Sequence, residues 1–237
     1  MWEQNKISVV LPVFNEEEGV KACIEEHFSI DIVDEIIAVD NNSTDNSADE
    51  IKKTNAKYVK EKHQGYGAAL QRGLKEATGD MIFMSESDNT FVAKDIYKFL
   101  AYADEFDVIF GSRTSKTLIW SGAKMNWFLR LGNIFVAKLL EYLYNGPCLT
   151  DVGCTKKFIK KNNLHKIRNK FTVKGSHFSP DFMILAIENR FKCVEIPINY
   201  KERVGESKIT SDFLKSFKLG LIYIMFIIKK KICEIII

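Results

Sequence analysis

The chain has 237 residues, of which 46% are hydrophobic and 27% charged, and its formal net charge at pH 7 is +3. This length and balance are typical of one globular domain with a small appendage at most, and so small a net charge does not indicate nucleic-acid binding. The charges are unevenly spread: the chain is acid-rich up to Asp107, whereas residues 113–174 carry many basic side chains and few acidic ones. The pattern favours an anionic ligand or an anionic membrane surface, although a solvated basic face produces it too.

The cysteines and histidines give no sign of a disulfide framework or a zinc site. The five cysteines are an odd number and form no CxxC pair, and the four histidines are scattered along the chain. We interpret the cysteines as buried apolar side chains in a reducing compartment. The first six residues hold no apolar signal-peptide core, which predicts a cytoplasmic protein or one on the cytoplasmic face of a membrane.

Short apolar segments alternate with helical segments in the first half of the chain. Strands are predicted at residues 7–13, 35–40, 57–59, 80–85 and 107–111, and helices at residues 16–28, 68–77 and between the second and third strands. Nearly all-apolar strands that alternate with helices indicate an α/β fold, with a mostly parallel sheet covered by helices on both faces.

Polar clusters follow four of these strands. They are residues 15–16, 40–45, 86–88 and 112–113. Ligands of such sheets bind beyond the carboxyl ends of the strands, so these four loops are expected to converge on one edge. This convergence is the strongest indication of a functional site.

The second half of the chain has a different pattern of predicted helices and strands. A long helix is predicted at residues 125–144, then strand-containing segments at 151–161 and 191–200 on either side of a helix near 180–189. The tail, residues 211–237, is almost entirely apolar apart from its lysines. Its longest uncharged run, residues 219–228, is too short to cross a bilayer, which takes roughly 20 residues. We expect a helix that lies in the headgroup region of a membrane, docks on the domain or packs against another subunit, including a second copy of the chain.

Two carboxylates, Glu86 and Asp88, come directly after the strand at residues 80–85. Spaced one residue apart, they can face the same hard divalent cation, which in turn binds diphosphate oxygens. Acidic pairs in loops are common and are often merely solvated. The preceding strand, the acidic loop at Asp40, the guanidinium of Arg113 and the basic second half favour the metal site.

The order of the motifs resembles that of family-two glycosyltransferases, which have the GT-A fold, a nucleotide-binding parallel sheet. The matching motifs are VVLPVFNE at residues 9–16, VDNNSTD at 39–45, GYGAA at 65–69, ATGD at 77–80, ESD at 86–88 and GSR at 111–113. The similarity continues through DVG at residues 151–153, EIPINY at 195–200 and RVGESK at 203–208. This last set resembles the branch that makes dolichol- or polyprenol-phosphate sugars. The match spans residues 7–210.

The resemblance implies roles for individual residues. Pro12, Phe14 and Glu16 would line the nucleoside pocket, and Asp40 would hydrogen-bond the base. Glu86 and Asp88 would hold Mg²⁺ or Mn²⁺. The other substrate-binding residues are Gly65 and Ser87, inside the matched motifs, and four cations that would meet the diphosphate or the acceptor phosphate, namely Arg113, Arg130, Arg203 and Lys208. Ordinary structural roles remain open for several of them, such as a turn for Asp40 or a surface ion pair for Arg203.

Three positions depart from the family pattern. Glu86 stands where the family usually has aspartate, and Asn41 stands where a second acidic residue is common. A glutamate is one methylene longer and can bind the metal less directly. Thr90 replaces a glutamine common in the mannose synthases, so the resemblance does not identify the donor sugar.

The predicted function is an inverting transfer of a hexose from a UDP-glucose-type or GDP-mannose-type donor to dolichyl or polyprenyl phosphate at the cytoplasmic membrane face. A phosphate acceptor is already anionic and needs little general-base help. A sugar hydroxyl would need a base, for which Asp151 and Asp181 are the candidates. The alternatives are transfer to a soluble glycan or protein-linked sugar, and a non-catalytic nucleotide-sugar-binding protein. Residues 1–113 would bind the donor, residues 114–210 the acceptor, and residues 211–237 the membrane or a partner.

Overall fold

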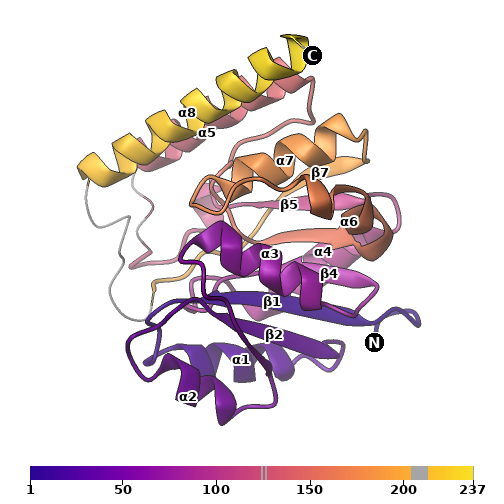
Figure 1. The fold of residues 1–237 in the computed structure, drawn as a ribbon, viewed down its shortest axis with the longest axis vertical. Helices are drawn as coiled ribbons and strands as arrows, with labels where there is room; N and C mark the ends of the chain where they lie inside the picture. Colours follow the sequence, from indigo (N-terminus) through magenta and orange to yellow (C-terminus); the bar gives the residue numbers. More distant parts are fainter. Residues whose placement is uncertain (124, 126, 204–212, 237) are drawn as a thin grey trace.

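A seven-stranded sheet forms the centre of the molecule (Figure 1). The structure, a computed structural model, describes residues 1–123, 125, 127–203 and 213–236, without the side chains of residues 213–215 and 235–236. The strand order is β3-β2-β1-β4-β6-β5-β7. The strands are β1 (Ile7–Val13), β2 (Glu35–Asp40), β3 (Lys57–Lys60), β4 (Met81–Met84), β5 (Val108–Ser112), β6 (Lys157–Lys160) and β7 (Cys193–Pro197).

The sheet is mostly parallel, as the sequence predicts. The pairs β1–β2, β1–β4, β2–β3 and β5–β7 are parallel, and β6 alone of these strands runs antiparallel, between β4 and β5. Strands from both halves of the chain therefore build one sheet. The proposed assignment of donor binding to residues 1–113 and acceptor binding to residues 114–210 stays a prediction.

Helices cover both faces of the sheet, because neighbouring strand residues point to opposite sides. Val10 belongs to one buried cluster, together with α3 (Tyr66–Glu76) and α7 (Phe178–Glu188), while Val9 belongs to the other, together with α1 (Val20–Phe28) and α4 (Ile96–Ala103). The remaining helices of the two layers are α2 (Ser47–Lys52) and α6 (Lys161–Ile167). Helix α3 lies very close to β1, since a Cβ built on Gly73 would lie 2.3 Å from Val10 Cγ1.

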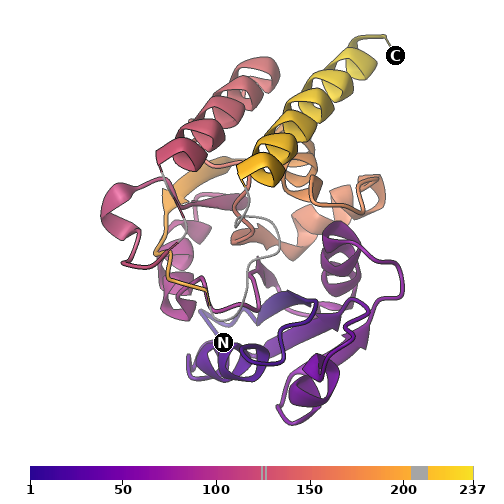
Figure 2. The same ribbon diagram turned by 90° about the vertical axis from the view of Figure 1, so that its left-hand side faces the viewer.

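Two long helices, α5 (Trp127–Tyr144) and α8 (Phe213–Ile236), lie side by side at one end of the molecule (Figures 1 and 2). The Tyr144 hydroxyl, at the C-terminal end of α5, donates to the carbonyl of Ile227 inside α8 at 3.0 Å. The C-terminal helix expected from the sequence is therefore present. Neither helix, nor any other in the described part of the chain, has the length and apolarity needed to cross a membrane.

Candidate active site

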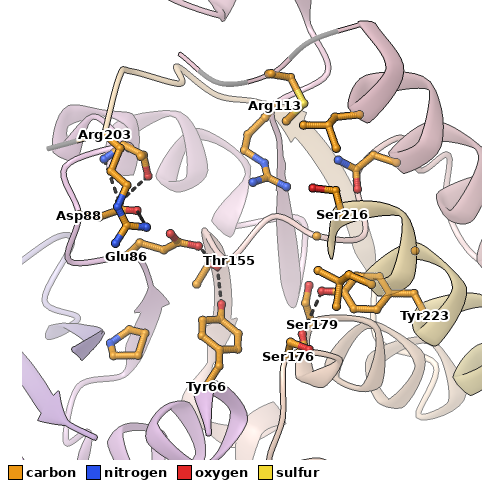
Figure 3. Close-up of a pocket in the computed structure, with 18 of the residues that line it drawn as sticks. Tyr66, Glu86, Asp88, Arg113, Thr155, Ser176, Ser179, Arg203, Ser216 and Tyr223 are labelled. Carbon is orange, nitrogen blue, oxygen red and sulfur yellow. Dashed lines mark hydrogen bonds and ion pairs between the residues drawn. The ribbon is translucent and has the colours of Figure 1, made fainter. Parts of the chain in front are cut away.

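A cavity of about 570 Å³ lies between the carboxyl ends of β1 and β4 and the helices α5 and α8 (Figure 3). Its two ends differ in chemistry. We call the polar end the part lined by Glu16, Glu86, Ser87, Asp88, Arg113, Thr155 and Arg203. We call the apolar end the part lined by Met125, Phe128, Leu129, Phe135, Val136, Phe217, Leu219, Leu221 and Ile224.

The loop after β4 is tied to its neighbours by hydrogen bonds. The Ser87 hydroxyl donates to the Pro12 carbonyl at 2.9 Å, and the Cys23 thiol lies 3.3 Å from the Glu86 carbonyl. The Asp88 carboxylate accepts from the amide and the hydroxyl of Thr90, at 3.0 and 2.6 Å. These contacts hold Glu86 and Asp88 at the carboxyl end of β4, and those of the Asp88 carboxylate use only Oδ1.

Arg203 joins two of the three carboxylates of the polar end. Its guanidinium pairs with Asp88 at 3.1 Å and also with Glu16, and Figure 3 shows it beside Asp88. The sequence predicts phosphate binding for Arg203, which stays a prediction, and the structure places Arg203 in the cavity beside Asp88. Residues 16, 88 and 203, far apart in the chain, thus meet at one point of the cavity.

Glu86 ends a chain of hydroxyl groups. The Tyr66 hydroxyl donates to the Thr155 hydroxyl, which donates to a carboxylate oxygen of Glu86 (Figure 3). Burial, together with the negative charge of Asp88, raises the pKa of Glu86 to about 8. The two carboxylates therefore repel one another in a poorly solvated place, which is an environment that a divalent cation stabilises.

The oxygens of Glu86 and Asp88 fit Mg²⁺ or Mn²⁺. In the described part of the chain no group of three or more acidic, histidine or cysteine side chains is placed to hold a metal. Mg²⁺ is commonly held by one or two carboxylates, with substrate phosphates and water completing the shell. The donor set thus suits a metal that arrives with a diphosphate better than a metal held by protein alone.

Arg113 is fixed by a bidentate ion pair with Asp151. Its Nε and Nη2 donate to the Asp151 oxygens at 2.8 and 2.9 Å, and its backbone amide donates at 3.0 Å. Burial acts to raise the pKa of Asp151, but the charge and hydrogen bonds of Arg113 prevail and hold it below its usual value. The pair is buried, and the ring of Tyr200 lies under the guanidinium at 5.5 Å. None of these three hydrogen bonds uses Nη1 of Arg113, and Arg113 lines the cavity.

The two carboxylates predicted as candidate bases do not line the cavity. Asp151 is fully buried and serves Arg113. Asp181, near the start of α7, is also fully buried, and its Oδ1 pairs with Lys230 at 2.5 Å. Each carboxylate is buried and paired with a cation, Arg113 in the cavity lining or Lys230 outside it, so the structure does not bring either one to an acceptor in this cavity.

Asp40 and Gly65 shape the backbone beside the site. The Asp40 carboxylate accepts from the Ser43 amide at 2.9 Å and from the Tyr58 hydroxyl at 3.3 Å, while the next residue, Asn41, lines the cavity. Gly65 has a positive φ of 151°, and a Cβ there would lie 2.3 Å from the carbonyl oxygen of Lys174. Asp40 and Gly65 do not line the cavity themselves, but residues next to them in the chain, Asn41 and Tyr66, do.

The other predicted residues divide between the cavity and elsewhere. Pro12, Phe14 and Ser87 line it. Arg130, on α5, is outside the lining, and its Nε is buried without a hydrogen-bond partner among the described residues. Lys208 lies outside the described residues.

Sequence reasoning missed Tyr66 and Thr155 as site residues. Tyr66 lies inside the GYGAA motif, and Thr155 follows the DVG motif by two residues. Proximity to those motifs was the only available signal. The hydrogen bonds from Tyr66 to Thr155 and from Thr155 to Glu86 bring together three segments that are distant in the chain.

Comparison with known proteins identifies the family. Residues 8–168 match Glycosyl transferase family 2, a span that covers more than half of the chain. The chain belongs to this family and is a glycosyltransferase.

Two curated relatives cover nearly the whole of this glycosyltransferase. A dolichyl-phosphate hexose transferase of Haloferax volcanii is 27% identical over 206 residues, which are 86% of this chain and 86% of the relative. An uncharacterized glycosyltransferase of Mycobacterium bovis is 25% identical over 217 residues, 91% of this chain and 94% of the relative.

Solved structures share the fold. Glucosyl-3-phosphoglycerate synthase of Mycobacterium tuberculosis, in complex with Mn²⁺, UDP and phosphoglyceric acid, has a TM-score of 0.71 at 18% identity, over 94% of this chain and 78% of that one. A complex of the same enzyme with Mg²⁺ and UDP has a TM-score of 0.67 at 17% identity, over 92% and 79%. The GT-A fold expected from the sequence is confirmed.

Proposed function

We propose that this glycosyltransferase moves a hexose, with inversion, from a nucleoside diphosphate sugar to a dolichyl or polyprenyl phosphate. One observation carries the proposal: a single cavity runs from the acidic groups Glu86 and Asp88 to an apolar groove between α5 and α8. A donor diphosphate suits the first end, and the hydrocarbon chain of a lipid acceptor suits the second. The name of the Haloferax volcanii relative supports the same acceptor class.

The polar end would bind the donor. Pro12, Phe14 and Glu16 line the side of the cavity next to β1 and are assigned to the nucleoside. Glu86 and Asp88 would hold Mg²⁺ or Mn²⁺, as the complexes of the structural neighbours suggest. When bound, the metal supplies positive charge that stabilises the leaving nucleoside diphosphate. Arg203 would turn from Asp88 towards the diphosphate, because a guanidinium binds two phosphate oxygens at once.

The acceptor phosphate would meet Arg113. An oxygen of the acceptor phosphate would attack the anomeric carbon of the donor hexose. The bond between that carbon and the nucleoside diphosphate would break, and its electron pair would leave with the diphosphate. The attacking oxygen is already anionic, so no proton has to be removed. The lining of the cavity agrees with a reaction that needs no base. Among the described residues its only acidic side chains are Glu16, Glu86 and Asp88, and Arg203 is paired with both Glu16 and Asp88.

The outer faces of α5 and α8 would lie on the cytoplasmic face of a membrane. Trp127 and Met225 are 72% and 70% exposed, and Lys138 and Lys229 are exposed on the same helices. Large apolar side chains with flanking lysines suit an anionic headgroup region. A lipid acceptor would then enter the groove from the bilayer beside it.

The test is transfer from radiolabelled UDP- and GDP-hexoses with Mn²⁺, Mg²⁺ or a chelator. Each reaction is offered undecaprenyl phosphate in detergent or, separately, 3-phosphoglycerate. We expect metal-dependent label in an organic-extractable, mild-acid-labile product. Label only with 3-phosphoglycerate would reject the lipid acceptor and favour a small phosphorylated one. The matched variant Asp88→Ala should abolish transfer; equal turnover by this variant would instead show that the cavity is not the catalytic site.

A further inference from the structure

Each of the two helices at the apolar end carries one glycine in the cavity lining, Gly132 on α5 and Gly220 on α8. Glycine inside a helix costs roughly 0.5–1 kcal/mol of stability relative to alanine. Such residues therefore call for a reason in packing or in function. The two glycines are far apart in the sequence but line the same cavity.

Close helix packing is not that reason. A Cβ built on Gly132 or on Gly220 meets no atom within 4 Å. Gly73 on α3 shows the opposite case, because its Cβ would collide with Val10. The space left by the absent side chains of Gly132 and Gly220 is thus part of the cavity rather than filled by a neighbouring helix.

The groove beside these glycines has the chemistry of a hydrocarbon site. Leu129 and Val136 flank Gly132 on α5, while Leu219 and Ile224 accompany Gly220 on α8, and all four line the cavity. The Ser216 hydroxyl, one turn before Gly220, is buried without a hydrogen-bond partner among the described residues. Ser216 and Arg113 both line the cavity, and Figure 3 shows them in the same part of it, where the groove meets the polar end.

We infer that Gly132 and Gly220 set the width of the groove, so that the first isoprene units of the acceptor lie between α5 and α8. This inference rests on the proposed function and adds two residues that determine acceptor specificity. A methyl-branched chain is wider than a plain alkyl chain, and a side chain at either position would take up space in the cavity and narrow its path. Glycine at both positions keeps that path open at the cost of helix stability.

The test compares Gly132→Leu and Gly220→Leu with Gly132→Ala and Gly220→Ala in the full chain. Leucine is a good helix former and fills the groove, whereas alanine improves the helix and adds one methyl group. The KM for farnesyl phosphate and for undecaprenyl phosphate is measured, with metal-dependent hydrolysis of the donor sugar as the readout of the polar end. Thermal unfolding of all four variants shows that they fold.

We expect the leucine variants to raise the KM for both isoprenyl phosphates about tenfold or more, which is typical of a steric change in an apolar pocket. Donor hydrolysis should stay within about twofold of the wild-type rate, and the alanine variants should melt higher and keep their KM. If the wild type uses both lipids and the leucine variants keep an unchanged KM, the inference is overturned while the proposed function stands. If the wild type transfers only to 3-phosphoglycerate, both are overturned together.

Discussion

The two ends of the cavity are held in place by different forces. At the polar end the charged side chains come from loops after strands and are already paired, as in Arg113 with Asp151 and Arg203 with Asp88. At the apolar end two helices contribute hydrocarbon side chains and glycines. Removing one member of a buried ion pair leaves the other charge buried without a partner, which costs several kcal/mol, whereas removing a methyl group costs only about 1 kcal/mol. The polar end should therefore govern the rate, and the apolar end the choice of acceptor.

The largest effect is expected from Asp88→Asn, which keeps the shape of the side chain but removes its charge. It would lose a metal ligand and leave Arg203 with Glu16 as its remaining carboxylate at this site. Loss of one electrostatic contact to the transition state costs roughly 10²–10³ in kcat. Initial rates at saturating donor and Mn²⁺ measure this, with the exposed Asp104→Asn as the control. A rate within about threefold of wild type would contradict the expectation that the polar end governs the rate.

The next effect is a pH dependence of stability caused by His27, which is buried close to the polar end. His27 is buried behind Glu86: its Nδ1 donates to the Cys23 carbonyl at 2.8 Å, and the Cys23 thiol contacts the Glu86 carbonyl. Burial, helped by the charge of Lys156, lowers the pKa of His27 to about 4 from an ordinary 6.5. Between these pH values the unfolded chain binds a proton that the folded chain does not, so the free energy of unfolding falls as the pH decreases.

The loss should begin near pH 6.5, be complete near pH 4 and amount to about 3 kcal/mol. Denaturant unfolding of wild type and His27→Leu across this range measures it, and the difference between the two proteins should narrow or reverse in acid. The exposed His165→Leu is the control and should follow wild type. Parallel curves for wild type and His27→Leu would show that His27 titrates normally.

A smaller effect is expected from Arg113→Lys, because an ammonium cannot reproduce the two-pronged contact with Asp151 and still offer a donor to the cavity. We expect kcat/KM for the acceptor to fall about thirtyfold, or about 2 kcal/mol, with donor KM nearly unchanged. The exposed Arg168→Lys is the matched control. An equal rise in donor KM would place Arg113 on the donor diphosphate instead.

The sequence predicted the strands, and the edge of the sheet at which their carboxyl ends meet, better than it predicted the ion-pair partners of individual side chains. The strands are runs of apolar residues, so their burial and the loops beyond their ends follow from local pattern. Asp151 illustrates what does not follow: as a carboxylate in a motif it is a reasonable candidate base, but only the approach of β5 brings Arg113 to it. Asp181 is similar, since its partner Lys230 comes from α8. Such pairings depend on tertiary packing, which a local motif does not contain.

The smallest of these effects is expected from Thr155→Val, a change of nearly equal volume that removes the hydroxyl between Tyr66 and Glu86. Glu86 would lose the hydrogen bond that orients it, and a carboxylate one methylene longer than aspartate needs that restraint to face the metal with Asp88. We expect the Mn²⁺ concentration for half-maximal activity to rise about tenfold, as for the loss of a contact that orients a ligand, with kcat at saturating metal largely retained. Thr155→Ser keeps the hydroxyl and should behave as wild type. If Thr155→Val instead altered the KM for the isoprenyl phosphate and left the metal requirement unchanged, Thr155 would belong with the acceptor groove, and the boundary between the two ends would have to be moved.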